Sequence, residues 1–205
     1  MYSQHEEDEV LAKIFGNWPK PGRFLDIGAA DGISCSNTWR LVTERNWGGL
    51  MVEPNPPHFA KLQQNLFKLP PAQQAGITPL SVGVSTEHGL VKFWSCGDLV
   101  STAVPGHKKL WEKSLNKETQ YQEIYVQMLT VEDILDQFKG PFDLVSIDTE
   151  GSSADIFIRM PIKEMAPKVI IVEHDSRLVE IGQVAQSHGY AQMWISGENV
   201  IYGRT

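Results

Sequence analysis

Residues 24–32 read FLDIGAADG, and after a helical pattern residues 48–54 read GGLMVEP. An apolar run, a glycine turn, a helix and a second apolar run ending in an acid predict a strand–turn–helix–strand unit of a nucleotide-binding sheet. The turn has the spacing D-x-G-x-x-x-G, which differs from the G-x-G-x-x-G of dinucleotide-binding enzymes. Because Gly28 and Gly32 can adopt positive φ, the backbone can pass close to a ligand there.

Two acids in this unit indicate the class of ligand. Glu53 follows the turn by about twenty residues, at the end of the second strand, where a carboxylate can accept both hydroxyls of a ribose. Asp26 lies where the first strand ends, and it can hold an ammonium group or order the turn. Such acids suit a ligand with positive charge better than a pyrophosphate, which favours S-adenosylmethionine over NAD. A plain strand-to-helix turn is the alternative explanation of the glycine spacing.

The composition is that of a soluble globular chain. A length of 205 residues with a hydrophobic fraction of 41% is enough for one core. The net charge of −7 argues against bulk binding of nucleic acid. Cys35 and Cys96 give neither a disulfide framework nor a metal-ligand spacing, and no stretch resembles a signal peptide or a membrane span. We expect a cytoplasmic protein of one domain, residues 1–205, whose oligomeric state stays open, a homodimer included.

The order of segments predicts the fold class. Residues 3–16 form a helical pattern within an N-terminal segment 1–22, with Ser3 as its cap. Apolar strand patterns follow at 24–26, 50–52, 77–84, 125–129, 142–148 and 169–172, and residues 90–94 could add an extra strand or hairpin. The last two, 190–195 and 199–202, are joined by a tight turn and must run antiparallel. We predict an α/β, class I methyltransferase Rossmann-like fold, whose mostly parallel seven-stranded sheet ends in a C-terminal antiparallel hairpin.

Residues 97–122 differ from the rest of the chain. They are polar, with Gly97, Pro105, Gly106 and several lysines, and they show little periodicity. A long irregular segment inside a compact domain is usually a functional lid or a mobile loop. We expect a loop on the substrate side, with a plain surface excursion as the alternative. Trp111 in this segment can line a sugar site or belong to the core.

Several separated motifs resemble those of the FkbM family of S-adenosylmethionine-dependent methyltransferases. They are FLDIGAADGISCSNTWRL (24–41), GGLMVEPNPPHFAKLQQN (48–65), Ser101-Thr102, DLVSIDTEG (143–151) and VIIVEHD (169–175). The opening Ser3-Gln4-x-x-Glu7-Asp8 is similar to the N-terminal motif of that family. The resemblance implies a Rossmann-like methyltransferase that mostly alkylates hydroxyl oxygens, often on sugars or other secondary metabolites.

The resemblance also implies which residues hold the cofactor. These are Asp26, Gly28, Ala30, Gly32 and Asn37 for the methionine part, Glu53 for the ribose, Gly83 and Val84 for the adenine, Ser3 and Gln4 as a cover from the N-terminal side, and Asp148 at the end of a later strand. The family usually carries a second acid shortly after its I-D-x-E-G motif, where this chain has Ser153. Any role of that acid is therefore in question here.

Titratable residues follow two of the later strands. Asp148 and Glu150 end one strand, and Glu173, His174 and Asp175 end the next. Ligands of open α/β sheets bind outside these strand ends. In one mechanism His174 is the general base, and Asp148 or Glu150 orients the substrate. In the other, Asp148, Glu173 and His174 hold a divalent ion such as Mg²⁺, although an all-oxygen set is more typical of that ion.

The sequence thus favours an S-adenosylmethionine-dependent methyltransferase that methylates a hydroxyl of a sugar or secondary metabolite. Its partner would be a small-molecule or glycan hydroxyl acceptor, which the sequence does not identify further. The alternative is a catalytically inactive, methyltransferase-like nucleotide-binding module that acts through partners. The histidines other than His174, including His58 and His88, are interpreted as surface residues.

Overall fold

A computed structural model describes residues 2–114 and 120–205. Its centre is a seven-stranded sheet with the strand order β3-β2-β1-β7-β8-β10-β9. The strands are β1 (Arg23–Ile27), β2 (Gly48–Val52), β3 (Ile77–Leu80), β7 (Leu144–Ile147), β8 (Val169–Glu173), β9 (Tyr190–Ile195) and β10 (Asn199–Arg204). Neighbouring strands are parallel except that β10 pairs antiparallel with β8 and β9. The predicted fold class, including the C-terminal hairpin, is confirmed.

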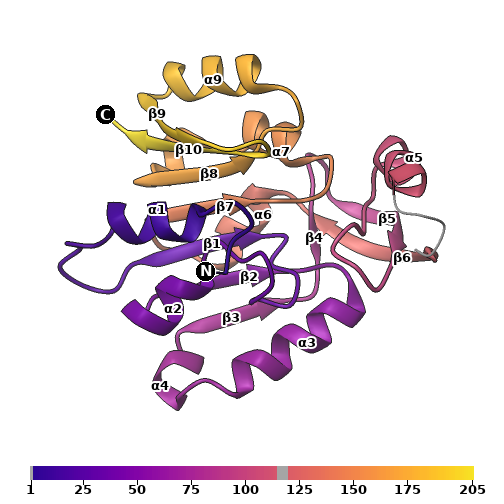
Figure 1. Ribbon diagram of the computed structural model, residues 1–205, viewed down its shortest axis with the longest axis horizontal. Coiled ribbons are helices and arrows are strands. Elements are labelled where there is room, and N and C mark those ends of the chain that lie inside the picture. The colour runs from indigo at the N-terminus through magenta and orange to yellow at the C-terminus, as the bar shows by residue number, and fades with distance from the viewer. Residues whose placement is uncertain (1, 115–119) are drawn as a thin grey trace.

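Helices cover both faces of this sheet (Figure 1). They are α1 (Glu7–Ile14), α2 (Trp39–Arg45), α3 (Pro56–Phe67), α4 (Pro71–Gln74), α6 (Val131–Gln137), α7 (Ser153–Arg159), α8 (Ile162–Met165) and α9 (Leu178–Ser187). Side chains alternate along each strand, so Phe24 packs in the cluster with Leu11 of α1, and Leu25 packs in the opposite cluster with Ile181 of α9. Two layers of core therefore explain why the central strands are apolar on both faces.

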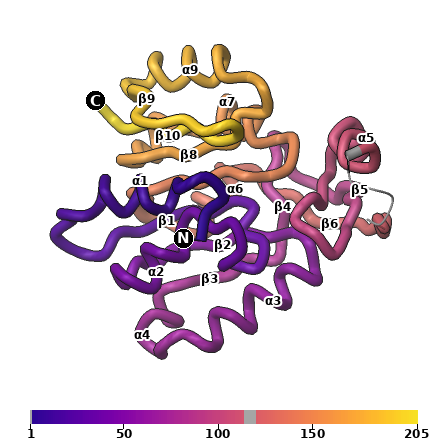
Figure 2. Tube along the Cα trace, in the orientation of Figure 1, coloured from indigo at the N-terminus to yellow at the C-terminus, as the bar shows by residue number. Residues whose placement is uncertain are grey.

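A second sheet stands beside the first, with the order β4-β6-β5. Its strands are β4 (Gly83–Val84), β5 (Gly89–Ser95) and β6 (Gln122–Leu129). The run predicted as one strand over 77–84 is thus divided between two sheets, because β3 pairs with β2 whereas β4 pairs with β6. Figures 1 and 2 show this sheet with helix α5 (Pro105–Ser114) projecting to the side of the main sheet.

Two segments differ from the expectation. Helix α1 begins at Glu7 rather than near Ser3, whose hydroxyl accepts the backbone N–H of Asp8 (3.0 Å) and donates to its carboxylate (2.6 Å). The residues before α1 therefore form a turn tied to the first turn of the helix. Residues 97–122 are not irregular throughout, since α5 has ten residues; residues 115–119 lie outside the described part. In the described ranges, no helix has the length and apolar character needed to cross a membrane.

Candidate functional site

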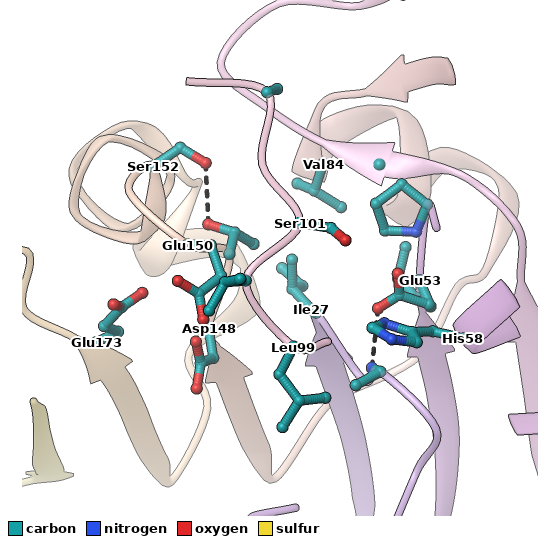
Figure 3. A pocket seen from close by; sticks show the side chains of 18 of the residues that line it. Ile27, Glu53, His58, Val84, Leu99, Ser101, Asp148, Glu150, Ser152 and Glu173 are labelled. Carbon is teal, nitrogen blue, oxygen red and sulfur yellow. Dashed lines mark hydrogen bonds between the residues drawn. The ribbon is translucent and has the colours of Figure 1, made fainter. Parts of the chain in front are cut away.

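One cavity lies at the carboxyl ends of the strands, between the main sheet and the second sheet (Figure 3). At one end it is lined by Glu53, His58 and Val84, and at the other by Asp148, Glu150 and Glu173. The remaining lining includes Gln4, Ile27, Gly28, Ala30, Cys35, Gly83, Phe93, Leu99, Val100, Ser101, Ala103, Trp111, Met128 and Glu198. Among the described residues, no lysine or arginine lines this cavity. Its walls therefore suit a neutral or cationic ligand better than an anionic one.

Gly28 lies between the two ends of the cavity, where β1 comes close to the end of β7. Its φ is 86°, and a Cβ atom there would lie 1.7 Å from the carbonyl oxygen of Asp148. Only glycine fits such an approach. The turn then continues through Ala30, whose N–H donates to Glu53 Oε2 (2.8 Å). The glycine turn thus joins the first strand, the end of β7 and Glu53 in one wall.

Glu53 is held at the end of β2 by the backbone. Its Oε2 accepts the N–H of Ala30, and its Oε1 accepts the N–H of Asn55 (2.7 Å). Burial raises the pKa of Glu53 to about 7, and the two N–H donors oppose this effect. Each carboxylate oxygen keeps a lone pair directed away from its backbone donor. The carboxylate is therefore fixed in orientation and able to accept further hydrogen bonds from a ligand.

Asp26 and Asn37 border a second, smaller cavity that shares Gly28, Cys35 and Asp148 with the first. Asp26 is buried and accepts a hydrogen bond from the Thr38 hydroxyl (2.6 Å). Burial raises the pKa of Asp26 to about 6, against the effect of its hydroxyl donors. The Asn37 amide donates to the Ser146 hydroxyl (3.3 Å). These two predicted residues thus lie close to the turn without lining the main cavity.

Three carboxyl groups gather at the opposite end of the cavity (Figure 3). Burial and then the charges of Glu173 and Glu150 raise the pKa of Asp148 well above its ordinary value. Burial and then Glu173 raise the pKa of Glu150 to about 8, and burial and then Asp175 raise the pKa of Glu173 to about 7. This end of the cavity therefore favours protons, hydrogen-bond donors and cations.

Residues of the 97–122 segment hold Glu150 in place. The Trp111 indole N–H donates to Glu150 Oε2 (3.1 Å), and the Thr102 hydroxyl donates to the Glu150 carbonyl (2.7 Å). His107 Nδ1 lies 3.6 Å from the same Oε2. Leu99, Val100, Ser101, Ala103 and Trp111 line the cavity. The segment therefore forms one wall of the site from residues far from the strand ends in sequence.

The arrangement can bind an elongated ligand that donates hydrogen bonds to the fixed carboxylate at one end and presents a cationic or hydroxyl-bearing part to the three carboxyl groups at the other. A comparison with known families identifies the family of the chain. Residues 26–197 match the Methyltransferase FkbM domain. The chain belongs to the FkbM methyltransferase family.

Solved structures of methyltransferases share the fold. The FkbM methyltransferase from Methylobacillus flagellatus KT superposes with a TM-score of 0.57 at 15% identity; the match covers 89% of this chain and 43% of that one. A putative methyltransferase, yhhF, from Escherichia coli gives 0.54 at 13% identity over 98% and 87%. The precorrin-6y C5,15-methyltransferase from Geobacter metallireducens GS-15 gives 0.52 at 15% identity over 97% and 87%. Curated proteins give no match to the sequence.

The expected catalytic and metal-binding histidine of this FkbM chain lies elsewhere. His174 is not among the residues that line the cavity, although its neighbour Glu173 is. The ring Nδ1 of His174 accepts the backbone N–H of Ser176 (3.2 Å), and the backbone N–H of His174 donates to the Glu198 carbonyl (2.8 Å). Of the set Asp148, Glu173 and His174, only the two carboxyl groups line the cavity, and the role expected for His174 stays a prediction.

Two histidines in or beside this site were missed: His58 lines the cavity, and His107 contacts the lining residue Glu150 without lining the cavity itself. His58, expected on the surface, is buried in α3 and lines the cavity with its Nε2 3.3 Å from the Gly97 carbonyl. His107 lies beside Glu150 although nothing in its local sequence indicates a site. The signal available for His58 was the helical spacing that places it on the same face as Leu62 and Leu66. For His107 we find no such signal, because its approach depends on tertiary packing.

The serine that replaces the usual family acid takes part in the same network. The Ser153 hydroxyl donates to Glu173 Oε2 (2.9 Å) and accepts the N–H of Thr149 (2.8 Å). An acid at this position would add a fourth negative charge beside Asp148 and Glu173. Of the other expected residues, Gln4, Gly83 and Val84 line the cavity, whereas Gly32 packs against Leu62 outside it.

Proposed function

We propose that this chain is an S-adenosylmethionine-dependent methyltransferase that transfers a methyl group to a hydroxyl oxygen. The observation that carries the proposal is a single cavity that joins the fixed carboxylate of Glu53 to the carboxyl group of Asp148 past the Gly28 turn. A cavity with a fixed carboxylate toward one end and several carboxyl groups at the other suits a ligand with a ribose near its middle and a sulfonium beyond it.

The donor occupies the side of the cavity formed by the first two strands. Glu53 accepts the ribose hydroxyls, and the apolar side chains of Val84, Phe93 and Met128 border the adenine near Gly83. The methionine part lies along Gly28 and Ala30, with its ammonium toward Asp26. Asn37 donates to its carboxylate, and Gln4 covers it from the N-terminal side.

The acceptor occupies the other end, with the 97–122 segment as its outer wall. Carboxylates of Asp148, Glu150 and Glu173 accept the hydrogen bond of its hydroxyl and attract the sulfonium. The oxygen then attacks the methyl carbon, the carbon–sulfur bond breaks with its electron pair returning to sulfur, and the hydroxyl proton leaves past these carboxylates to solvent. Alignment of oxygen, carbon and sulfur supplies about 7–11 kcal/mol in favourable cases.

Calorimetric titration with S-adenosylmethionine and S-adenosylhomocysteine tests the donor site. Wild-type protein should bind both, and Glu53→Ala should weaken binding at least about tenfold, because charge-assisted hydrogen bonds to each hydroxyl contribute about 1.5–3 kcal/mol. Glu44→Ala is the matched control, since Glu44 is exposed on α2 and pairs only with Arg40 among the described residues. Absence of binding by the wild type at high micromolar concentration would overturn the proposal.

A screen of hydroxyl acceptors, read by release of S-adenosylhomocysteine, tests the reaction. Sugars and glycans without phosphate or carboxylate groups are the first choice, because the acceptor end is lined by carboxylates and by no described cation. Turnover with amines or thiols but with no hydroxyl compound would contradict O-methylation while leaving methyl transfer intact.

A further inference from the structure

We propose that His107, Glu150 and Glu173 form a binding site for a divalent transition-metal cation at the acceptor end of the cavity. The side chains come from helix α5, from the loop after β7 and from the end of β8, so no local sequence pattern links them. One ligand atom from each residue lies within 4.8 Å of the other two. This set replaces the one expected from the sequence, in which His174 was a ligand.

His107 presents a nitrogen that nothing else satisfies. Its Nδ1 is buried and has no hydrogen-bond partner among the described residues. The nearest acceptor is Glu150 Oε2 at 3.6 Å, beyond hydrogen-bond range. An imidazole binds a metal through the lone pair of a ring nitrogen, which at His107 Nδ1 is not used in a hydrogen bond among the described residues. An unpartnered buried nitrogen thus faces two carboxylates.

The backbone beside Glu150 leaves room for the imidazole. Gly151 has a φ of 102°, and a Cβ atom there would lie 2.8 Å from the His107 ring. The ring therefore packs directly on the glycine backbone, next to the Glu150 carboxylate. Any larger residue at 151 would push the nitrogen away from the two glutamates.

The charges at this end of the cavity also favour a cation. A carboxylate oxygen of Glu150 and one of Glu173 lie within 4.8 Å of each other, so two ionised groups there repel each other. No lysine or arginine among the described residues lines the cavity to compensate them. A bound dication would convert this mutual repulsion into attraction.

The ligand types select the class of metal. One imidazole nitrogen with two carboxylates suits Mn²⁺, Fe²⁺, Co²⁺ or Zn²⁺ better than Mg²⁺, which prefers oxygen ligands alone. Bonds of about 2.0–2.2 Å require ligand atoms roughly 3–3.5 Å apart. The three ligand atoms, now within 4.8 Å of one another, would have to move closer as the cation binds, and water or the acceptor would fill the remaining positions.

The consequence for catalysis rests on the proposed methyl transfer. A cation held here would bind the acceptor hydroxyl, lower its pKa and fix the direction of its oxygen. The oxygen would still form its bond to the methyl carbon as the carbon–sulfur bond breaks, and the proton would leave the metal-bound hydroxyl for solvent. The binding of the cation itself does not depend on this reaction.

The test uses tag-free, EDTA-treated protein without S-adenosylmethionine, titrated with MnCl₂ by calorimetry and by Mn²⁺ electron paramagnetic resonance, and separately with ZnCl₂. We expect one cation per chain. His107→Ala and Glu173→Gln should each weaken binding at least about tenfold, and Gly151→Ala should weaken it by displacing the ring. His188→Ala is the matched control, since His188 is exposed and its ring hydrogen-bonds, among the described residues, only to Val184 and Ser187 of the preceding helix α9.

Absence of Mn²⁺ and Zn²⁺ binding by the wild type, or undiminished binding by both His107→Ala and Glu173→Gln, would overturn the inference. If His107→Ala does not fold, as judged by circular dichroism, Glu173→Gln decides alone. If the proposed donor site is wrong but the metal site is right, the wild-type protein will bind Mn²⁺ and will not bind S-adenosylmethionine. Turnover that is unchanged by EDTA while Mn²⁺ binds would refute the catalytic role of the cation.

Discussion

Single residues in this site face a conflict between stability and binding, and Asp26 is the clearest case. Its carboxylate is buried beneath the glycine turn, where the Thr38 hydroxyl donates to it but no cation among the described residues contacts it. A protein optimised only for stability would place a neutral side chain there. The charge is consistent with the ligand ammonium that we propose.

Asp26→Asn should therefore stabilise the free protein at neutral pH. The folded-state pKa of about 6 lies above the ordinary value of 3.8, so the folded state binds the proton more tightly and wild-type stability falls as pH rises between these values. A shift of about two units corresponds to about 3 kcal/mol as an upper bound. Urea unfolding of both proteins at pH 4 and pH 7.5 measures the effect.

The stability difference between Asp26→Asn and the wild type should grow with pH and level off above about pH 7. Asparagine keeps an acceptor for Thr38, so the comparison isolates the charge. An Asp26→Asn variant that is less stable than the wild type at pH 7.5, with the same pH dependence, would contradict the pKa assignment.

His174 offers a second comparison at this scale. Because its ring does not line the cavity, His174→Ala should keep kcat/KM within about threefold of the wild type once an acceptor is known. Asp148→Asn should lower kcat/KM at least about tenfold, since Asp148 lies at the acceptor end. Steady-state release of S-adenosylhomocysteine measures both variants. A His174→Ala variant that folds but has no activity would support His174 as the general base.

At the scale of elements, the contact between β1 and β7 determines the shape of the site. The Gly28 backbone approaches Asp148 so closely that the two strand ends form one continuous wall. Parallel pairing of β1 with β7 extends to Ile27 and Ile147 and fixes this register.

Gly28→Ala should destabilise the fold by about 3 kcal/mol or more, because its Cβ would overlap the Asp148 carbonyl and its φ is positive. Gly106→Ala is the control within α5. Apart from its chain neighbours and the backbone of its own helix, no described residue has an atom within 4 Å of a Cβ at that position, so this change should be neutral or stabilise by up to about 1 kcal/mol. Chemical denaturation measures both variants. Equal stability of the two would show that the strand ends separate more easily than the structure indicates.

The strands of the main sheet are the elements that the sequence predicts best. The buried strands β1, β2, β7 and β8 are mostly apolar, and the tight turn before β10 forces an antiparallel pair, so the sheet could be predicted from pattern alone. Glu53 could be placed because it follows β2 directly.

The remaining site residues depend on tertiary contacts. The position of helix α5 over Glu150 depends on contacts between distant segments, because Trp111 of the helix and Thr102 before it both donate hydrogen bonds to Glu150. The sequence does not determine whether the His174 ring faces the cavity, since the direction of a side chain just after a strand depends on how the loop turns. His58 was misassigned because a polar residue on an amphipathic helix is usually exposed.

For the molecule as a whole, ligand binding should appear as a gain in thermal stability. A ligand at one hundred times its Kd adds about 2.7 kcal/mol to the free energy of unfolding. For a chain of 205 residues this corresponds to a rise in Tm of about 5–10 °C. Differential scanning fluorimetry with S-adenosylmethionine, S-adenosylhomocysteine and NAD⁺ measures it. Stabilisation by NAD⁺ alone would contradict the proposed donor.

The two ends of the cavity are encoded in different parts of the gene. Most of the donor side comes from residues 27–58, together with Gln4 and the short strand β4, whereas much of the acceptor wall comes from the single stretch 99–111. Exchange of that stretch between relatives could thus alter the accepted alcohol while the donor-binding half is inherited intact. Diversification of acceptor range within the family would then require only local replacement.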